Sequence, residues 1–153
     1  MAGDWKVNAG RLWAVGATTA VIAGLAAAIV WLFATQVFDE TLYVTSPGGS
    51  DLVELSVGQT FIAAFIAGIL ATGAMHLMLA FVPRGSMFFG LLATLVLFVM
   101  FIPVLTLPDA TTANMIWLSV MHVVVYLVIV PTLTGSVPRV AMRIQPIPPP
   151  PPA

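Results

Sequence analysis

The chain has 153 residues, of which 60% are hydrophobic and only 7% carry a formal charge. An ordinary soluble domain has a charged fraction of about 25%, so this composition excludes one and indicates a membrane protein. The net charge of −1 gives no attraction to nucleic acid, and the absence of cysteine excludes disulfides, thiol chemistry and cysteine metal sites.

Four uncharged tracts are long enough to cross a bilayer, because about 20 apolar residues in a helix span its hydrocarbon layer. They are residues 12–38, 57–82, 87–107 and 113–134. Together they use most of the chain. We therefore predict an all-α protein: one four-helix transmembrane domain over residues 1–144, followed by a proline-rich tail over residues 145–153.

The basic residues indicate how the tracts are oriented. All five lie before the first tract, between the second and third, or after the fourth: Lys6, Arg11, Arg84, Arg139 and Arg143. Alternating spans bring these three places to one face of the membrane, and the positive-inside rule makes that face cytoplasmic. Both termini are therefore expected in the cytoplasm, and five of the six carboxylates outside.

The first two tracts carry small residues at every fourth position, which form a small-residue ridge along one side of each predicted helix. The first has Gly16, Ala20, Gly24 and Ala28, and the second has Thr60, Ala64, Gly68, Thr72 and His76. In lipid, burying apolar area does not drive helices together, so small residues that let backbones approach closely mark packing interfaces. We predict a close antiparallel pair of these helices as the core of the bundle. The alternative is that glycine and alanine merely fill helix volume.

The connection between these two tracts has the pattern of a small β-hairpin in the first outside loop. Residues 41–45 and 51–55 flank the turn-forming cluster Ser46-Pro-Gly-Gly-Ser50. An isolated hairpin is marginal in water, so this one needs support from the helix ends or from a partner. Ser56 and Gln59 have the spacing of a capping box, which predicts the start of the second helix.

The second half of the chain is predicted from its glycines and prolines. Residues 83–86 form a tight turn that makes the second and third helices neighbours. The third tract is bulky and lacks a small-residue ridge, so we expect much of it to face lipid or another protein. Pro103 should kink that helix or end its regular hydrogen bonding. Gly135 is predicted to stop the fourth helix, whose candidate caps are Asp109, Thr111 and Thr112.

Two histidines, His76 and His122, lie deep in the tracts, and titratable groups inside a membrane are candidates for function. Counted along the helices at 1.5 Å per residue, their heights differ by roughly 10 Å, which disfavours one haem or metal held by both. For His76 a structural role is favoured, with the imidazole satisfied by nearby carbonyls or threonine hydroxyls. The candidates for those hydroxyls are Thr18, Thr19, Thr72 and Thr94.

A second polar feature is the stripe of Ser119, His122 and Tyr126 on one face of the fourth helix. This stripe can be satisfied internally, contact a partner protein, or receive the head of a quinone or similar lipophile. Internal packing or a partner is favoured over a ligand.

The inventory of reactive groups argues against an enzyme. No carboxylate lies in any tract, and HExxH zinc spacing and phosphate-cradling glycine loops are absent. We therefore expect no catalysis, no metal and no cofactor. The favoured function is an accessory or assembly subunit that packs against other integral membrane subunits. The alternative is binding or transport of a quinone or lipid-like molecule by the stripe. The tail favours polyproline II, which suits a partner surface.

Three short motifs add a resemblance: Gly73-Ala-Met-His76, Phe81-Val-Pro-Arg84 and Met121-His122. With its four-span plan, the chain resembles uncharacterised four-helix membrane proteins of actinobacteria. Its format is similar to that of small accessory factors of the actinobacterial cytochrome bcc–aa3 respiratory supercomplex. This resemblance covers the whole chain as architecture, and no functional residues carry over. It implies a cofactor-free, multi-pass protein of the bacterial plasma membrane, bound at the rim of a respiratory complex.

Single cysteines test the predicted topology, because the chain has none of its own. We predict that a membrane-impermeant maleimide added to intact cells labels the Ser50→Cys variant. The Ala2→Cys and Ala153→Cys variants should react only after the membrane is permeabilised. Labelling of just one of the two terminal cysteines in intact cells would contradict a four-span chain.

Overall fold

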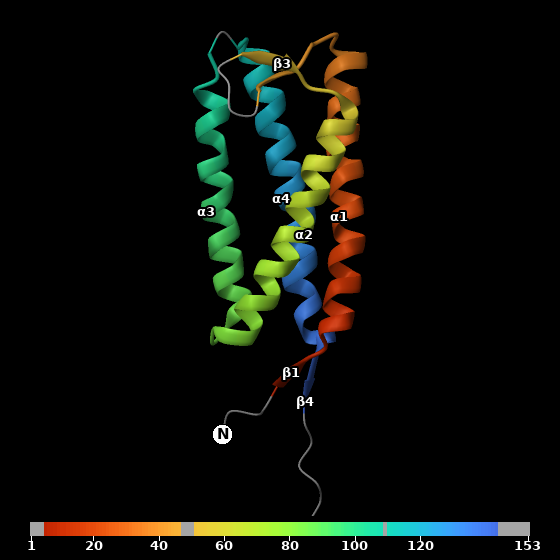
Figure 1. Cartoon of the computed structure of the whole chain (residues 1–153), viewed down its shortest axis with the longest axis vertical. Coiled ribbons are helices and arrows are strands. Elements are labelled where there is room, and N and C mark those ends of the chain that lie inside the picture. The colour runs from red at the N-terminus through yellow and green to blue at the C-terminus, as the bar shows by residue number, and fades with distance from the viewer. Residues whose placement is uncertain (1–4, 47–50, 109, 144–153) are drawn as a thin grey trace, which may run out of the picture.

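The computed structural model describes residues 5–46, 51–108 and 110–143. Four long helices lie side by side along the long axis of the molecule (Figure 1), and each is long and apolar enough to cross a membrane. The predicted four-helix bundle is therefore confirmed. The helices are α1 (Ala9–Leu32), which continues into the π-helical turn η1 (Phe33–Val37), α2 (Val57–Phe81), α3 (Gly85–Leu105) and α4 (Thr112–Val140). Asp109 and the predicted proline-rich tail lie outside the described residues.

Each end of the bundle carries one pair of short antiparallel strands. β2 (Tyr43–Thr45) pairs with β3 (Leu52–Glu54), with Val44 opposite Val53, which confirms the predicted hairpin. At the opposite end, β1 (Trp5–Val7) pairs with β4 (Ala141–Arg143) (Figure 1). This second pair was not predicted. It holds the two terminal segments together at one end of the bundle.

The interface between α1 and α2 is the most extensive in the bundle, and the two helices approach each other closely there. A Cβ atom on Gly68 would lie 2.7 Å from the Cα of Ala20, and one on Gly24 would lie 2.8 Å from the ring of Phe61. Both distances are shorter than ordinary contact, so only glycine fits at these positions.

The predicted ridge residues lie largely at this interface. A Cβ on Gly16 would overlap the side chain of Thr72. The buried members are Gly16, Ala20 and Gly24 on α1, and Thr60, Ala64, Gly68 and Thr72 on α2. Ala28 is only half-buried, and the neighbouring Ala27 takes the buried place. His76, at the end of the α2 ridge, is half-buried.

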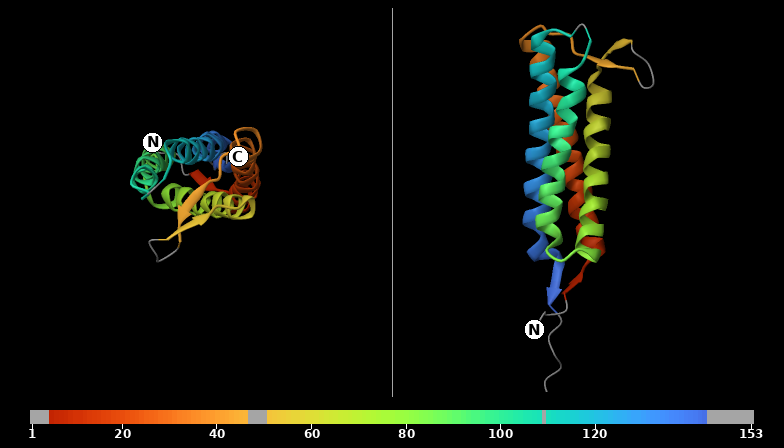
Figure 2. Two further views of the ribbon diagram at one scale, coloured as in Figure 1. Left: turned by 90° about the horizontal axis from the view of Figure 1, so that it is seen from above. Right: turned by 90° about the vertical axis from the view of Figure 1, so that its left-hand side faces the viewer.

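The other two helices pack onto this pair unequally. Near the end that carries the β1–β4 pair, Leu12 of α1 and Leu133 of α4 are fully buried in one cluster with Met75 of α2 and Phe89 of α3. Only three of the 21 residues of α3 are buried, namely Gly85, Phe89 and Val104. Seen from above, α3 stands at the edge of the bundle away from α1 (Figure 2).

The start of α2 and the turn between α2 and α3 lie where the local sequence predicts them. Gln59 accepts from the Ser56 backbone N–H at 2.9 Å, and its own N–H donates to Ser56 Oγ at 3.2 Å, which completes the capping box. Arg84 has a left-handed φ of 58° in the tight turn before α3. A Cβ on Gly85 would overlap the Met78 carbonyl, so the turn requires glycine there.

The prediction for the end of α4 is wrong. The helix does not stop at Gly135 but runs to Val140, through Pro131 and Pro138. Pro131 lacks the N–H that would bond the Leu127 carbonyl four residues before it, and membrane helices tolerate such an internal proline. The other internal proline, Pro103, stands near the end of α3, which finishes two residues later at Leu105.

The glycine contacts predict opposite outcomes for two helix-interior substitutions. Gly68→Ala forces α1 and α2 apart and should lower the free energy of unfolding by about 1–3 kcal/mol. Gly90→Ala, at an open position of α3 with no atom within 4 Å of the new Cβ, should leave stability unchanged or raise it by up to about 1 kcal/mol. Reversible unfolding in detergent measures both. Equal effects would show that the close approach is not the cause.

Candidate functional site

The stripe of Ser119, His122 and Tyr126 lies in the membrane-spanning part of α4, and all three side chains are half-buried. Their spacing of three and four residues keeps them on one side of the helix. The three polar groups nevertheless have different surroundings, which decide whether they can act together.

Tyr126 links α4 to α3. Its hydroxyl lies 2.8 Å from Thr94 Oγ1, and the Thr94 hydroxyl also lies 2.9 Å from the Gly90 carbonyl. A carbonyl only accepts, so the single Thr94 proton goes to Gly90, and Tyr126 donates to Thr94. This hydrogen bond is an interhelical contact of the kind that holds membrane helices in register.

His122 bonds within its own helix. Its Nδ1 lies 2.7 Å from the Leu118 carbonyl, so Nδ1 carries the proton, and Nε2 is the acceptor of the neutral ring. The imidazole also faces α3, where the Phe101 ring centroid lies 6.5 Å away at an interplanar angle of 57°. The hydrogen bond fixes one ring orientation in an apolar setting.

Of the three residues, Ser119 lines an apolar groove that His122 and Tyr126 do not line. The groove, of about 450 Å³, runs between α4 and the end of α3 near the hairpin. Its lining residues are Leu105, Thr112, Met115, Ile116, Ser119, Val120, Val123 and Val124. The structure thus separates the stripe: Ser119 meets the groove, while Tyr126 and His122 have their described bonds to α3 and to α4 itself.

His76 has no such partner within the described chain. Its Nδ1 is buried without a hydrogen bond, so the predicted satisfaction by threonine hydroxyls fails for this atom. Each candidate hydroxyl instead donates to the carbonyl four residues before it in its own helix, a common arrangement for helical threonine, and its oxygen, which can still accept, does not reach Nδ1. These hydroxyls are Thr18, Thr19, Thr72 and Thr94.

The hairpin is held by the ends of two helices. Asn114 of α4, with 1% of its surface exposed, accepts from the Tyr43 backbone N–H at 2.9 Å and donates to its carbonyl at 3.2 Å. Trp31 of α1 donates from Nε1 to the Leu55 carbonyl at 2.6 Å. The support that an isolated hairpin lacks therefore comes from the bundle itself.

Sequence reasoning missed Asn114. Its signal was an amide placed at the start of an apolar tract, where an unpaired polar group would be costly. Among the caps proposed for this helix, Thr111 accepts from the Asn114 N–H at 3.0 Å. In the described part of the chain, no three His, Cys, Asp or Glu side chains come together as a metal site.

A model of a protein family matches residues 7–139, which include almost all of the four helices and the hairpin. The chain belongs to the family of unknown function DUF6069. Comparisons of this DUF6069 chain with curated proteins and with solved structures gave no match.

The Tyr126–Thr94 bond gives a testable energy in this DUF6069 bundle. In a double-mutant cycle of Tyr126→Phe and Thr94→Val, the coupling should be about 0.6 kcal/mol, with an upper bound near 1.7 kcal/mol. Unfolding in detergent measures it. Ser119→Ala paired with Thr94→Val is the control, because Ser119 makes no described bond to α3, and should show no coupling. A coupling energy of zero between Tyr126 and Thr94 would contradict a stabilising hydrogen bond between α3 and α4.

Proposed function

We propose that this chain is a non-catalytic accessory or assembly subunit that packs against a larger membrane complex. The observation that carries the proposal is the outward face of α3. Six large apolar residues follow one another along it at alternating spacings of three and four, and all are exposed: Phe88, Leu91, Leu95, Phe98, Ile102 and Leu105.

That spacing is the one by which a helix presents side chains to a neighbouring helix in left-handed packing. We call this row of six residues, from Phe88 to Leu105, the α3 seam. It runs along almost all of α3, which buries only three residues within its own bundle. The Tyr126–Thr94 bond fixes α3 against α4, so the seam has a fixed orientation relative to the rest of the bundle. A second membrane helix of bulky apolar surface is the partner that fits it.

The use of the polar groups supports a non-catalytic role. Tyr126, Thr94 and His122 are committed to interhelical or intrahelical hydrogen bonds, and Asn114 and Trp31 hold the hairpin. No set of these groups converges on one cavity. Catalysis requires such convergence of an acid, base or nucleophile with a binding site.

The resemblance to accessory factors of the cytochrome bcc–aa3 supercomplex suggests which kind of complex the chain packs against. We therefore extend the proposal to a respiratory complex of the bacterial plasma membrane, with both termini in the cytoplasm. The positive charge at the β1–β4 end supports that orientation through the positive-inside rule.

A second candidate function rests on the groove at Ser119. An apolar groove of about 450 Å³ with one hydroxyl suits a quinone or lipid-like molecule, which would make the chain a binding or transport protein. The positions of His122 and Tyr126 favour the first proposal, because neither lines the groove.

Site-specific photocrosslinking in native membranes tests the seam. We expect a photoreactive residue at Leu95 on α3, which is 60% exposed, to link to the subunits of one multi-subunit complex that also co-elutes in mild detergent. The matched position is Leu70 on α2, which is 68% exposed, and it should link to lipid. Lipid adducts at both positions, with a chain that purifies alone, would contradict docking. A quinone or lipid that co-purifies with this solitary chain and is lost in Ser119→Phe would establish the second candidate.

A further inference from the structure

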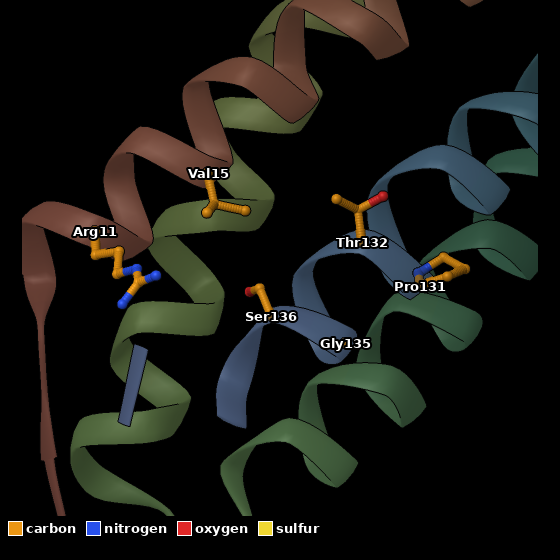
Figure 3. Close-up of a pocket in the computed structure, with 6 residues that line it drawn as sticks. All are labelled: Arg11, Val15, Pro131, Thr132, Gly135 and Ser136. Atoms are coloured by element: carbon orange, nitrogen blue, oxygen red, sulfur yellow. The ribbon is translucent and has the colours of Figure 1, made fainter. Parts of the chain in front are cut away.

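A cleft at the end of the bundle that carries the termini has a composition unlike the groove at Ser119. It lies between the first turns of α1 and the last turns of α4 and has a volume of about 390 Å³. Arg11 and Val15 reach toward it from α1, and Ser136 faces them from α4 (Figure 3). Pro131, Thr132 and Gly135 complete its lining.

The cleft changes from a charged mouth to an uncharged interior over one helical turn. Because α1 and α4 run in opposite directions, Arg11 is level with Ser136 at the mouth. Val15 is level with Pro131 and Thr132 one turn deeper, which is about 6 Å further into the membrane. Such a gradient matches an amphipathic molecule seated at the membrane surface, with a charged head and an apolar body. A free anion would use only the mouth.

The charge at the mouth is cationic. Arg11 is exposed, and its guanidinium carries five donors suited to phosphate. All five basic residues of the chain lie at this end, either in β1, α1, α4 and β4 or, for Arg84, in the turn before α3. The register of β1 and β4 places Trp5 opposite Arg143 and Lys6 opposite Met142. The acidic residues that the structure describes lie at the hairpin end, a full bundle length away: Asp39, Glu40, Asp51 and Glu54.

Gly135 makes the room. A Cβ built on this residue would meet no atom within 4 Å, so the missing side chain leaves open space beside α4 and is not needed for helix packing. Gly16 and Gly68 differ from Gly135, because atoms of a neighbouring helix occupy the space beside each of them.

We propose that this cleft binds an anionic phospholipid, with Arg11 holding the headgroup phosphate and the space at Gly135 taking the glycerol and the start of the acyl chains. Basic pockets between membrane helices are suited to such headgroups. The Ser136 and Thr132 hydroxyls donate to the carbonyls of Leu133 and Val128, so the donors for the phosphate come from Arg11. This proposal is independent of the docking function.

The test is native mass spectrometry of the full chain, titrated with phosphatidylglycerol or with zwitterionic phosphatidylcholine. The unmodified chain should retain phosphatidylglycerol in preference. Arg11→Gln should weaken that binding by about tenfold or more, since a hydrogen bond to a charged group is lost. Gly135→Leu should also abolish the preference, although it changes no charge. An excess of inorganic phosphate should not displace the lipid.

Two matched variants separate the cleft from general attraction. Arg84→Gln removes the same charge at the same end but outside the cleft, and it should weaken binding by less than about fivefold. Gly90→Leu fills an equally open helical position on α3 and should have no effect. Circular dichroism and gel filtration confirm that each variant is folded. Equal losses in Arg11→Gln and Arg84→Gln, full binding by Gly135→Leu, or displacement by phosphate would each overturn the proposal.

Discussion

The rest of the bundle depends on the close approach of α1 and α2. In lipid there is no hydrophobic force between helices, so their association relies on van der Waals contact and on interhelical hydrogen bonds. Here the contact is made at glycine backbones: the backbone and Cβ of Ala20 occupy the space that a side chain on Gly68 would need, and the Thr72 side chain occupies the space beside Gly16. This pair is the base on which α4 packs, through Leu12 and Leu133. It leaves α3 at the edge, held by Phe89 and by the Tyr126–Thr94 bond.

Most of this architecture was predictable because its signals are local or periodic. The length of each apolar tract gives the helices, the four-residue spacing of small residues gives the first packing pair, and Ser56 with Gln59 gives a helix start. The hairpin followed from a turn cluster between two apolar segments. In each case the residues that decide the structure lie within a few turns of one another, or repeat at a period that a helix imposes.

The features that were missed depend on contacts between distant parts of the chain. The β1–β4 pair joins segments that are more than a hundred residues apart, and its strands are too short to show a pattern. Asn114 holds Tyr43 across 71 positions. Gly135 was predicted to stop α4 from its residue type alone, but its role is spatial, since it opens the cleft beside Arg11. The spacing of the stripe could not show that Tyr126 bonds Thr94 while Ser119 lines the groove, because both contacts depend on how α3 packs against α4.

A cysteine pair tests the central contact most directly, because the chain contains no other cysteine. The variant with both Ala20→Cys and Gly68→Cys places two Cβ atoms so close that a shift of about 1 Å reaches the 3.5–4.5 Å range of disulfides. The account predicts rapid intramolecular crosslinking of α1 to α2 in the membrane under mild oxidation. Failure of this pair to link, with efficient linking of Gly68→Cys to Ala93→Cys on α3 instead, would contradict it.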